Sequence, residues 1–433
     1  MIANTITVKF QGVEVGVLSY VSGDGYATFQ YYPDWAMNGF AIDPINMPLS
    51  NEPYKFTGID RDVFRGLPAV FADSLPDDFG NAVINQWLAS QGNSIEDFGP
   101  LDRLLYIGNR GMGGLEYEPA VDTESNQPVQ LQISSLVEMA QEVLNDRTDL
   151  RMDLKHDDAM YQLCQIGTSA GGARAKAVIA INDDMSEVRS GQVDVPEGFE
   201  HYLIKFDGVN PKNKNDQGFG AAMSFGIMEY AYHVMAIACG IDMMHCDLFE
   251  ENGRSHFVTK RFDRASNQKY HTLSLCGMAY ASFKKIGQYS YEEFLSIARE
   301  LDLTHSEQVQ IFTRMAFNVI ARNQDDHTKN FSFLVNDDLE WQLAPAFDIA
   351  FSYDPSSQWV AKHAMTINGK RDNFARDDLL SVAKLITGFR VAQANMIIDK
   401  TIAVVSKWET YANEYGVAEK LTALVAKNLR LKI

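Results

Sequence analysis

Residues 324–331 read Q-D-D-H-T-K-N-F, and residues 343–350 read L-A-P-A-F-D-I-A. In the first stretch Asp325 stands five residues before Asn330, and the second stretch carries a lone carboxylate, Asp348. Phosphoryl transfer needs an Asp that accepts or orients the attacking hydroxyl. It also needs oxygen ligands, typically an Asn and a second Asp, that hold Mg²⁺ against the nucleotide phosphates. The two stretches therefore predict a phosphoryl-transfer site, although D-x-x-x-x-N alone is more often an acidic surface turn.

The surroundings of this motif favour the catalytic interpretation. Residues 311–323 (I-F-T-R-M-A-F-N-V-I-A-R-N) have helical apolar spacing, and residues 330–335 (N-F-S-F-L-V) resemble a strand. Residues 341–348 (W-Q-L-A-P-A-F-D) predict a second short strand that ends at Asp348. A helix, a polar loop and a short hairpin ending in a carboxylate is how the C-terminal lobe of a protein kinase displays its site.

Length and composition limit the fold and the partners. A chain of 433 residues exceeds what one hydrophobic core serves, so two or three domains are expected. The composition, 46% hydrophobic and 22% charged, is that of a globular protein. A formal net charge of −19 makes the surface repel nucleic acid and anionic membranes. DNA contact would need a basic partner or a local basic patch, and residues 362–371 (K-H-A-M-T-I-N-G-K-R) are more typical of a solvated loop.

No sequence feature indicates a secreted or membrane protein. The first ten residues alternate like a strand, without a basic segment followed by an apolar run. The longest apolar stretch, residues 228–244, is interrupted by Glu229, His233 and Asp242. We therefore expect a cytoplasmic protein. Its four cysteines lack C-x-x-C spacing and are expected to be reduced: Cys164, Cys239, Cys246 and Cys276.

The order of patterns predicts an α+β fold with a sheet-rich first part and a helical C-terminal half. Residues 5–32 predict a β-meander, and residues 77–88 and a segment after Ser94 predict helices. A polar stretch at 121–129 suggests a boundary, and a helix is expected at 134–144. Strands are expected at 177–182, 201–206 and 256–262. Beyond about residue 285 we expect helices at 291–301 and before Asp325, with three more to the end.

A glycine-rich segment precedes the second group of strands. Residues 164–181 read C-Q-I-G-T-S-A-G-G-A-R-A-K-A-V-I-A-I, and such glycines let the backbone approach and cradle an anion. Gly167 and Gly172 match the G-x-x-x-x-G part of a Walker A motif. The required Lys-Ser/Thr is missing, because Ala173 and Arg174 follow. The segment also departs from the G-x-G-x-x-G of protein kinases, so a phosphate loop and a plain β-turn both stay open.

Two charged residues lie in apolar surroundings. Lys205 stands within H-Y-L-I-K-F and either faces solvent from an edge strand or is held by a charge inside the protein. Glu229 falls on the apolar face of the helix predicted around it, unless it lies wet at the margin of that face. A Lys205–Glu229 ion pair would satisfy both residues, and kinases use such a pair to position ATP phosphates.

Six motifs, in order along almost the whole chain, resemble the HipA family, the serine/threonine-kinase toxins of bacterial HipBA toxin–antitoxin modules. They are F-A-D-S-L-P-D-D-F-G (71–80), R-G-M-G-G-L-E-Y-E-P (110–119), S-A-G-G-A-R-A-K (169–176), V-T-K-R-F-D-R (258–264), D-D-H-T-K-N-F-S-F (325–333) and L-A-P-A-F-D-I (343–349). The resemblance implies a two-lobed, protein-kinase-like fold. It assigns residues 1–120 to an added N-terminal β-rich region, 121–265 to the kinase N-lobe, and 266–433 to a helical C-lobe.

The resemblance also implies roles for individual residues. Asp325 would be the catalytic base, Asn330 and Asp348 the Mg²⁺ ligands, and Ser169 the self-phosphorylated serine whose modification switches the enzyme off. Arg174 and Ala175 depart from the Gln and Glu of the best-known members. Gln-Asp-Asp also replaces the His-Arg-Asp of ordinary kinases, and Phe-Asp-Ile replaces their Asp-Phe-Gly. The remaining nucleotide-binding positions would be Gly171, Gly172, Ala173, Arg174, Lys176, Lys205, Glu229, Lys260, Arg261, Phe262, His327 and Lys329, with the run from Lys260 to Phe262 lining the adenine.

As a member of this family, the chain would use ATP and Mg²⁺ and would arrest growth by phosphorylating a protein of the translation machinery. Its expected partner is a small helix-turn-helix antitoxin of the HipB type, through which it would reach operator DNA and repress its own operon. Two other classes of protein stay open. One is a small-molecule kinase of related fold, and the other is a nucleotide-binding corepressor without catalysis.

Overall fold

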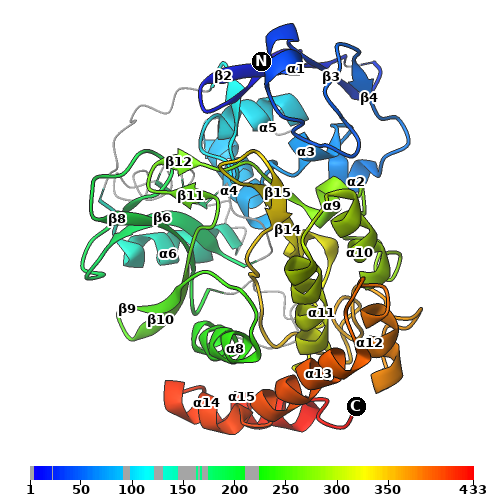
Figure 1. Cartoon of the computed structure of the whole chain (residues 1–433). Helices are drawn as coiled ribbons and strands as arrows, with labels where there is room; N and C mark the ends of the chain where they lie inside the picture. The colour runs from blue at the N-terminus through cyan, green and yellow to red at the C-terminus, as the bar shows by residue number, and fades with distance from the viewer. Residues whose placement is uncertain are drawn as a thin grey trace. The chain divides into compact units, whose positions relative to one another are not determined.

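The computed structural model describes residues 4–21, 23–90, 98–120, 130–144, 162–163, 166–167, 174–209 and 224–433. The chain forms two compact units (Figure 1), each of which is described by itself below. The first unit comprises residues 1–213 and 249–273, and the second comprises residues 214–248 and 274–433. The predicted boundary at 121–129 lies outside the described residues, so the three predicted domains stay a prediction.

The first sheet of the first unit is antiparallel and confirms the predicted β-meander. Its strands are β1 (Thr5–Phe10), β2 (Val13–Tyr20), β3 (Ala27–Tyr31), β4 (Tyr54–Lys55) and β5 (Leu115–Glu118), in the order β4-β3-β2-β1-β5. Ile6 and Val8 alternate into the core as a half-buried strand requires. Gln11 and Gly12, both with positive φ, make the tight turn between β1 and β2. Short helices accompany this sheet: α1 (Pro33–Asn38), α2 (Arg61–Phe64), α3 (Ala69–Ala72) and α5 (Pro100–Ile107).

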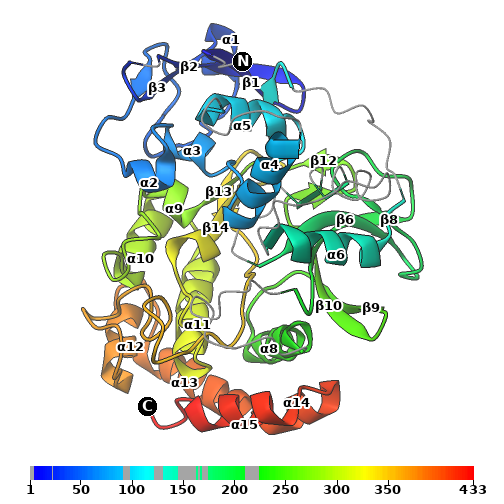
Figure 2. The same ribbon diagram turned by 180° about the vertical axis from the view of Figure 1, so that it is seen from behind.

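The second sheet of the first unit has the order β7-β6-β8-β10-β9. Its strands are β6 (Lys176–Asn182), β7 (Val188–Ser190), β8 (Phe199–Lys205), β9 (Cys246–Glu251) and β10 (Arg254–Lys260). Helices α4 (Asp78–Ser90) and α6 (Ile133–Leu144) cover one face of the sheet (Figure 2). Phe79 and Val83 of α4 and Leu136 of α6 share a buried core with the strands. Beyond β10 lie β11 (Arg264–Ala265), β12 (Gln268–Lys269) and β13 (Thr272–Ser274).

The second unit is mainly helical and is built around α11 (His305–Ile320). Every side chain from Ile311 to Ile320 is buried, because α8, α10, α12 and α13 surround this helix. Thr304 and Glu307 form a capping box at its start. The other elements are α8 (Phe225–Cys239), α9 (Leu275–Met278), α10 (Tyr291–Glu300), η2 (Thr328–Asn330), β14 (Ser332–Val335), β15 (Trp341–Leu343), α12 (Arg376–Ala383), α13 (Val391–Val405), α14 (Trp408–Tyr415) and α15 (Glu419–Asn428).

Three predictions about the second unit were wrong. Four helices follow the candidate site instead of three, because Ser406 and Lys407 alone separate α13 from α14, without a glycine or proline to mark the break. Strand β15 ends at Leu343 and not at Asp348, since Pro345 has no N–H with which to continue a ladder. Residues 362–371 are not simply a solvated loop: His363 is fully buried within them.

None of the helices that the structure describes combines the length and the apolar character that crossing a bilayer requires. The described cysteines, Cys239, Cys246 and Cys276, are buried free thiols, and Cys164 lies outside the described residues.

Candidate active site

The loop that carries Asp325 is anchored at its start within the second unit. Helix α11 stops at Ile320, and Arg322 takes a left-handed φ of 59°, which turns the chain out of the helix. The backbone N–H of Gln324 then donates to the Ser352 carbonyl at 3.1 Å. These contacts present residues 325–330 as a fixed loop between α11 and β14.

Asn330 closes this loop on itself. Its Nδ2 donates to the backbone carbonyl of Asp325 at 2.8 Å, and its N–H donates to the carbonyl of His327 at 2.9 Å. The side-chain amide is therefore oriented by the main chain of the candidate base. With Nδ2 used in this way, the Oδ1 atom is the one that is available to a cation.

Asp348 and Asn330, the two predicted metal ligands, line the same small pocket. Asp348 has a φ of 55°, a left-handed conformation that Asp tolerates better than most residues and that often marks functional sites. Within the described ranges, no group of three or more His, Cys, Asp or Glu side chains forms a complete metal site. One carboxylate and one amide oxygen nevertheless suit Mg²⁺, which takes few protein ligands and completes its shell with phosphate and water.

The two adjacent carboxylates of the loop have opposite surroundings. The side chain of Asp325 is 44% exposed, and its Oδ1 lies 3.8 Å from Nε2 of His327. The side chain of Asp326 is fully buried. Of these two carboxylates, only that of Asp325 is accessible to an incoming hydroxyl, and its role as base stays a prediction.

Asp326 has a different task, which sequence reasoning missed. Its Oδ2 accepts hydrogen bonds from the Tyr291 hydroxyl at 2.9 Å and from Nδ1 of His363 at 2.8 Å. Its Oδ1 accepts from the backbone N–H of Ala364 at 2.8 Å. No pattern near residue 326 could have identified partners that stand 35 to 38 residues away.

Lys205 and Glu229 are both buried, at 8% and 2% exposure. Lys205 ends the central strand β8, and its Nζ lies 5.6 Å from the centroid of the Phe257 ring, so the edge-strand alternative is wrong. Glu229 faces the interior from α8, so the alternative of a wet margin is wrong too. Since the two residues belong to different units, their ion pair stays a prediction.

The predicted phosphate loop is described only at its ends. Ser169, Gly171, Gly172 and Ala173 lie outside the described residues, and Arg174 is half-buried. Lys176 is buried at the start of β6, where its Nζ lies 3.5 Å from Oδ2 of Asp77. One of the three acidic residues in F-A-D-S-L-P-D-D-F-G, Asp77, therefore pairs with the lysine that ends S-A-G-G-A-R-A-K.

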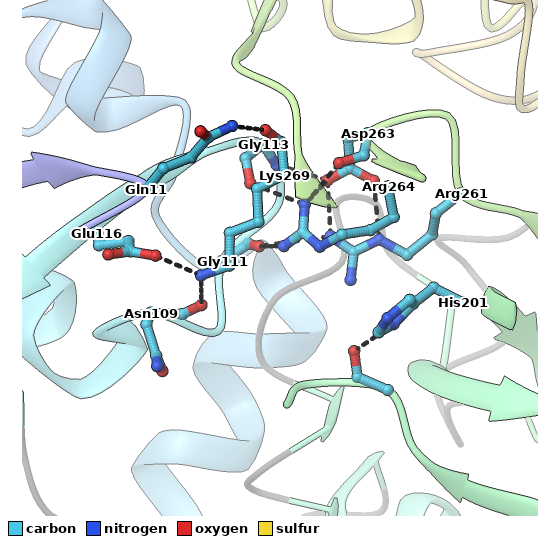
Figure 3. Close-up of polar contacts among 11 residues, drawn as sticks. Gln11, Asn109, Gly111, Gly113, Glu116, His201, Arg261, Asp263, Arg264 and Lys269 are labelled. Carbon is cyan, nitrogen blue, oxygen red and sulfur yellow. Dashed lines mark hydrogen bonds and ion pairs between the residues drawn. The ribbon is translucent and has the colours of Figure 1, made fainter. Parts of the chain in front are cut away.

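A buried ionic cluster overlaps the predicted adenine-lining run, since Arg261 belongs to both (Figure 3). Asp263, with a side chain that is fully buried, accepts from Nε and Nη2 of Arg261 at 2.8 and 2.6 Å and from Nη1 of Arg264 at 2.9 Å. Burial by itself raises the pKa of a carboxyl, but Arg261 and Arg264 hold the pKa of Asp263 well below its usual range. The cluster is therefore ionic in the folded protein.

This cluster also binds the segment that precedes β5. The Gly113 N–H donates to Oδ2 of Asp263 at 2.6 Å, while Arg264 donates to the carbonyls of Gly111 and Gly113 at 3.0 and 2.9 Å. Gly113 has a φ of 76°, and a Cβ there would lie 2.7 Å from Oγ1 of Thr272, so only glycine fits. The motifs R-G-M-G-G and R-F-D-R thus form one structural site.

The predicted adenine-lining residues have other contacts in the first unit. Lys260 pairs with Glu200 at 3.0 Å on the surface, and the backbone N–H of Arg261 donates to the His201 carbonyl at 2.9 Å. Two nitrogens of the Arg261 guanidinium, Nε and Nη2, already donate to Asp263. Sequence reasoning assigned Arg261 to the nucleotide and missed its structural partner.

Comparison with known proteins shows which family this chain is similar to. A model of the HipA N-terminal domain matches residues 6–118, and a model of the HipA-like C-terminal domain matches residues 168–408. A Sinorhizobium fredii protein named "Putative kinase Y4mE" is 24% identical over 205 residues, which cover 45% of this chain and 42% of that relative. The Shewanella oneidensis HipA, solved with HipB and operator DNA, matches with a TM-score of 0.67 and 16% identity over 98% of this chain and 94% of its own. This last match confirms the predicted α+β fold.

Proposed function

Because this chain belongs to the HipA family, we propose that it is an ATP- and Mg²⁺-dependent serine/threonine protein kinase that acts as the toxin of a toxin–antitoxin module. One observation carries the proposal. Asn330 and Asp348 line a single pocket. The side-chain amide of Asn330 donates a hydrogen bond to the backbone carbonyl of Asp325, and the Asp325 carboxylate is exposed to solvent. A base and two metal ligands are the groups that phosphoryl transfer to a hydroxyl requires.

In this proposal each candidate site residue of the second unit has a defined role. Asp325 accepts the proton of the attacking serine or threonine hydroxyl and orients its oxygen. Asn330 and Asp348 hold Mg²⁺, which when bound neutralises charge on the nucleotide phosphates. His327 and Lys329 lie on the same loop and contribute positive or polar groups near the phosphates. From the first unit, Lys205 would contact the phosphates, and residues 260–262 would contact the adenine.

The proposed partners follow from the family and from charge. The HipA of Shewanella oneidensis was solved together with HipB and operator DNA. With a net charge of −19, this chain is unsuited to bind DNA alone. We therefore propose that a basic helix-turn-helix antitoxin carries it to operator DNA, where the complex represses its own operon. A protein of the translation machinery is the proposed substrate.

The test is phosphoryl transfer by Asp325→Asn. This change keeps the side-chain shape and removes the carboxylate, so the rate should fall by about 10²-fold or more. ATP binding should persist, because the phosphate and adenine contacts lie on other residues. Asp338→Asn, an exposed residue in the turn between β14 and β15, is the matched control and should transfer phosphate at the wild-type rate.

Two outcomes would contradict the proposal. Equal rates for Asp325→Asn and Asp338→Asn would remove Asp325 from catalysis. Absence of any Mg²⁺-dependent transfer by the wild-type chain would favour the nucleotide-binding corepressor. Offering protein fractions and metabolite fractions separately with labelled ATP decides between a protein kinase and a small-molecule kinase.

Self-phosphorylation at Ser169 is part of the same proposal. A phosphate adds about −1.5 to −2 charges at neutral pH, which would repel the nucleotide phosphates from a loop that covers them. Peptide mass spectrometry after incubation with Mg·ATP should therefore find phosphate on Ser169 and falling activity. Phosphate on Thr168 instead, or a modified chain that stays active, would disprove this switch.

A further inference from the structure

The buried carboxylate beside the candidate base begins a chain of side-chain contacts that reaches Arg430. Oδ2 of Asp326 lies 2.8 Å from Nδ1 of His363, and Nε2 of His363 lies 2.8 Å from Nη1 of Arg430. Nη2 of Arg430 in turn donates to Oδ1 of Asp372. All four residues belong to the second unit. We refer to Asp326, His363, Arg430 and Asp372 as the C-terminal clamp.

The donors and acceptors of the clamp determine the state of His363. An arginine has only donors, so Nε2 of His363 must accept from Arg430. The proton of the neutral imidazole is then on Nδ1, where it donates to Asp326. His363 is fully buried and packs edge-on against Phe374, with 5.3 Å between ring centroids. The ring is thus fixed both by packing and by hydrogen bonds at its two nitrogens.

Arg430 of the clamp and its neighbour Asn428 both contact the segment that leads into the catalytic loop. The backbone N–H of Arg430 donates to the carbonyl of Ile320, the last residue of α11, at 2.9 Å. Nε of Arg322 donates to the Asn428 carbonyl at 2.7 Å, and its Nη1 donates to Oε1 of Gln324 at 2.9 Å. Residues 428–430 therefore support the chain immediately before Asp325.

We propose that the C-terminal clamp is a positioning device for phosphoryl transfer, in which His363 and Arg430 hold Asp326, and through it the backbone of Asp325, in the geometry that transfer requires. The inference rests on the proposed kinase function and adds a group of residues from the far end of the chain to it. None of these residues needs to touch ATP or the acceptor. Their loss should lower kcat for transfer while leaving the KM for ATP nearly unchanged.

Arg430→Met is the first test, because methionine keeps much of the stem and removes the hydrogen bonds to His363 and Asp372. A shift of about 1 Å in a reacting group can cost about 10²-fold, so we expect kcat to fall by about 10- to 100-fold. Arg376→Met is the matched control. Arg376 also contacts the C-terminus, through the Ile433 carbonyl, as well as Asn395 and Asp399, but has no link to Asp326.

Two variants of His363 separate positioning from simple structural support. His363→Asn keeps an N–H near the place of Nδ1 and should retain a large part of the wild-type kcat. His363→Phe keeps the ring against Phe374 but has no donor for Asp326, so its kcat should fall as in Arg430→Met. Equal losses in both variants, or a raised KM for ATP in each, would overturn the positioning role.

Hydrogen–deuterium exchange gives a readout that does not depend on activity. The N–H of Ala364, which donates to Asp326, and peptides covering residues 321–331 should exchange about tenfold faster in Arg430→Met and at the wild-type rate in Arg376→Met. Unchanged exchange together with unchanged kcat would disprove the clamp. If the wild-type chain transfers no phosphate but exchange is still faster in Arg430→Met, the clamp holds the loop, while the proposed function and with it the positioning role for transfer are refuted.

Discussion

Replacing Asp263 by Asn should lower the free energy of unfolding of the first unit by about 3–5 kcal/mol, because removing one member of a buried ionic cluster leaves its partners uncompensated. The side chains of Asp263 and Arg261 are 0% and 1% exposed, and that of Arg264 is 6% exposed. Water therefore cannot replace the lost carboxylate. For a domain of 150–250 residues this loss corresponds to a fall in Tm of about 6–20 °C.

The assay is thermal and urea-induced unfolding of Asp263→Asn, followed by circular dichroism. Asp24→Asn is the control, since Asp24 pairs with Lys55 on the surface, where such pairs contribute about 0–1 kcal/mol. The double variant Asp263→Asn/Arg261→Met should recover part of the loss, because it also removes a buried positive charge. A loss below about 1 kcal/mol, or one equal to that of Asp24→Asn, would refute this account of the cluster.

The pH dependence of this effect follows from the depressed pKa of Asp263. Its unfolded pKa is about 3.9. The stabilisation is therefore fully present above about pH 4 and is lost as the pH falls through the lower, folded pKa. The difference between wild type and Asp263→Asn should stay constant from neutral pH down to about pH 4 and shrink only in stronger acid.

Three further predictions concern other sites. Asp348→Asn, which keeps a residue that tolerates φ of 55°, should abolish the Mg²⁺ dependence of ATP affinity in calorimetric titration without lowering Tm, and an unaltered Mg²⁺ effect would place the metal elsewhere. Tyr291→Phe removes a donor to Asp326 and an acceptor for Asn318, so urea unfolding should show a loss of about 1–3 kcal/mol; no loss would mean that water replaces the hydroxyl. Burial lowers the pKa of His271 to about 4, so its stabilisation, complete above about pH 6.5, should fall by about 2 kcal/mol at pH 5. His271→Gln should have a shallower stability–pH profile than wild type between these values, and equal profiles would show that His271 does not titrate on unfolding.

Local patterns predicted many of the helices and strands in each of the two units. Alternation identified the meander of β1, β2 and β3, and apolar periodicity identified α10 and α11, because each burial pattern follows from neighbours in the sequence. The motif spacing also placed Asn330 and Asp348 in one site, which the structure brings to one pocket. Such predictions succeed where the pattern of apolar residues within one short segment is enough to determine which of its side chains are buried.

The buried polar residues could not be predicted in the same way. Asp326 and Arg430 are separated by about a hundred residues and are joined only through His363. Arg261 was assigned to the nucleotide, yet its guanidinium serves Asp263. A buried charged residue needs a partner to offset the free energy of its desolvation. Either a ligand or a distant side chain can supply that partner, and the sequence around the residue does not show which.

The contact between Gly113 and Asp263 has a consequence for synthesis of the chain on the ribosome. The two residues are 150 positions apart. At a translation rate of about 5–20 residues per second, roughly 8–30 s pass between the synthesis of Gly113 and that of Asp263 and the arginines beside it. During this time the Gly111–Gly113 segment lacks its final partners for a backbone N–H and two carbonyls, and water can hydrogen-bond to these groups instead. The nascent N-terminal sheet therefore exposes a hydrated edge at this position, where an apolar contact would have left a surface prone to aggregation.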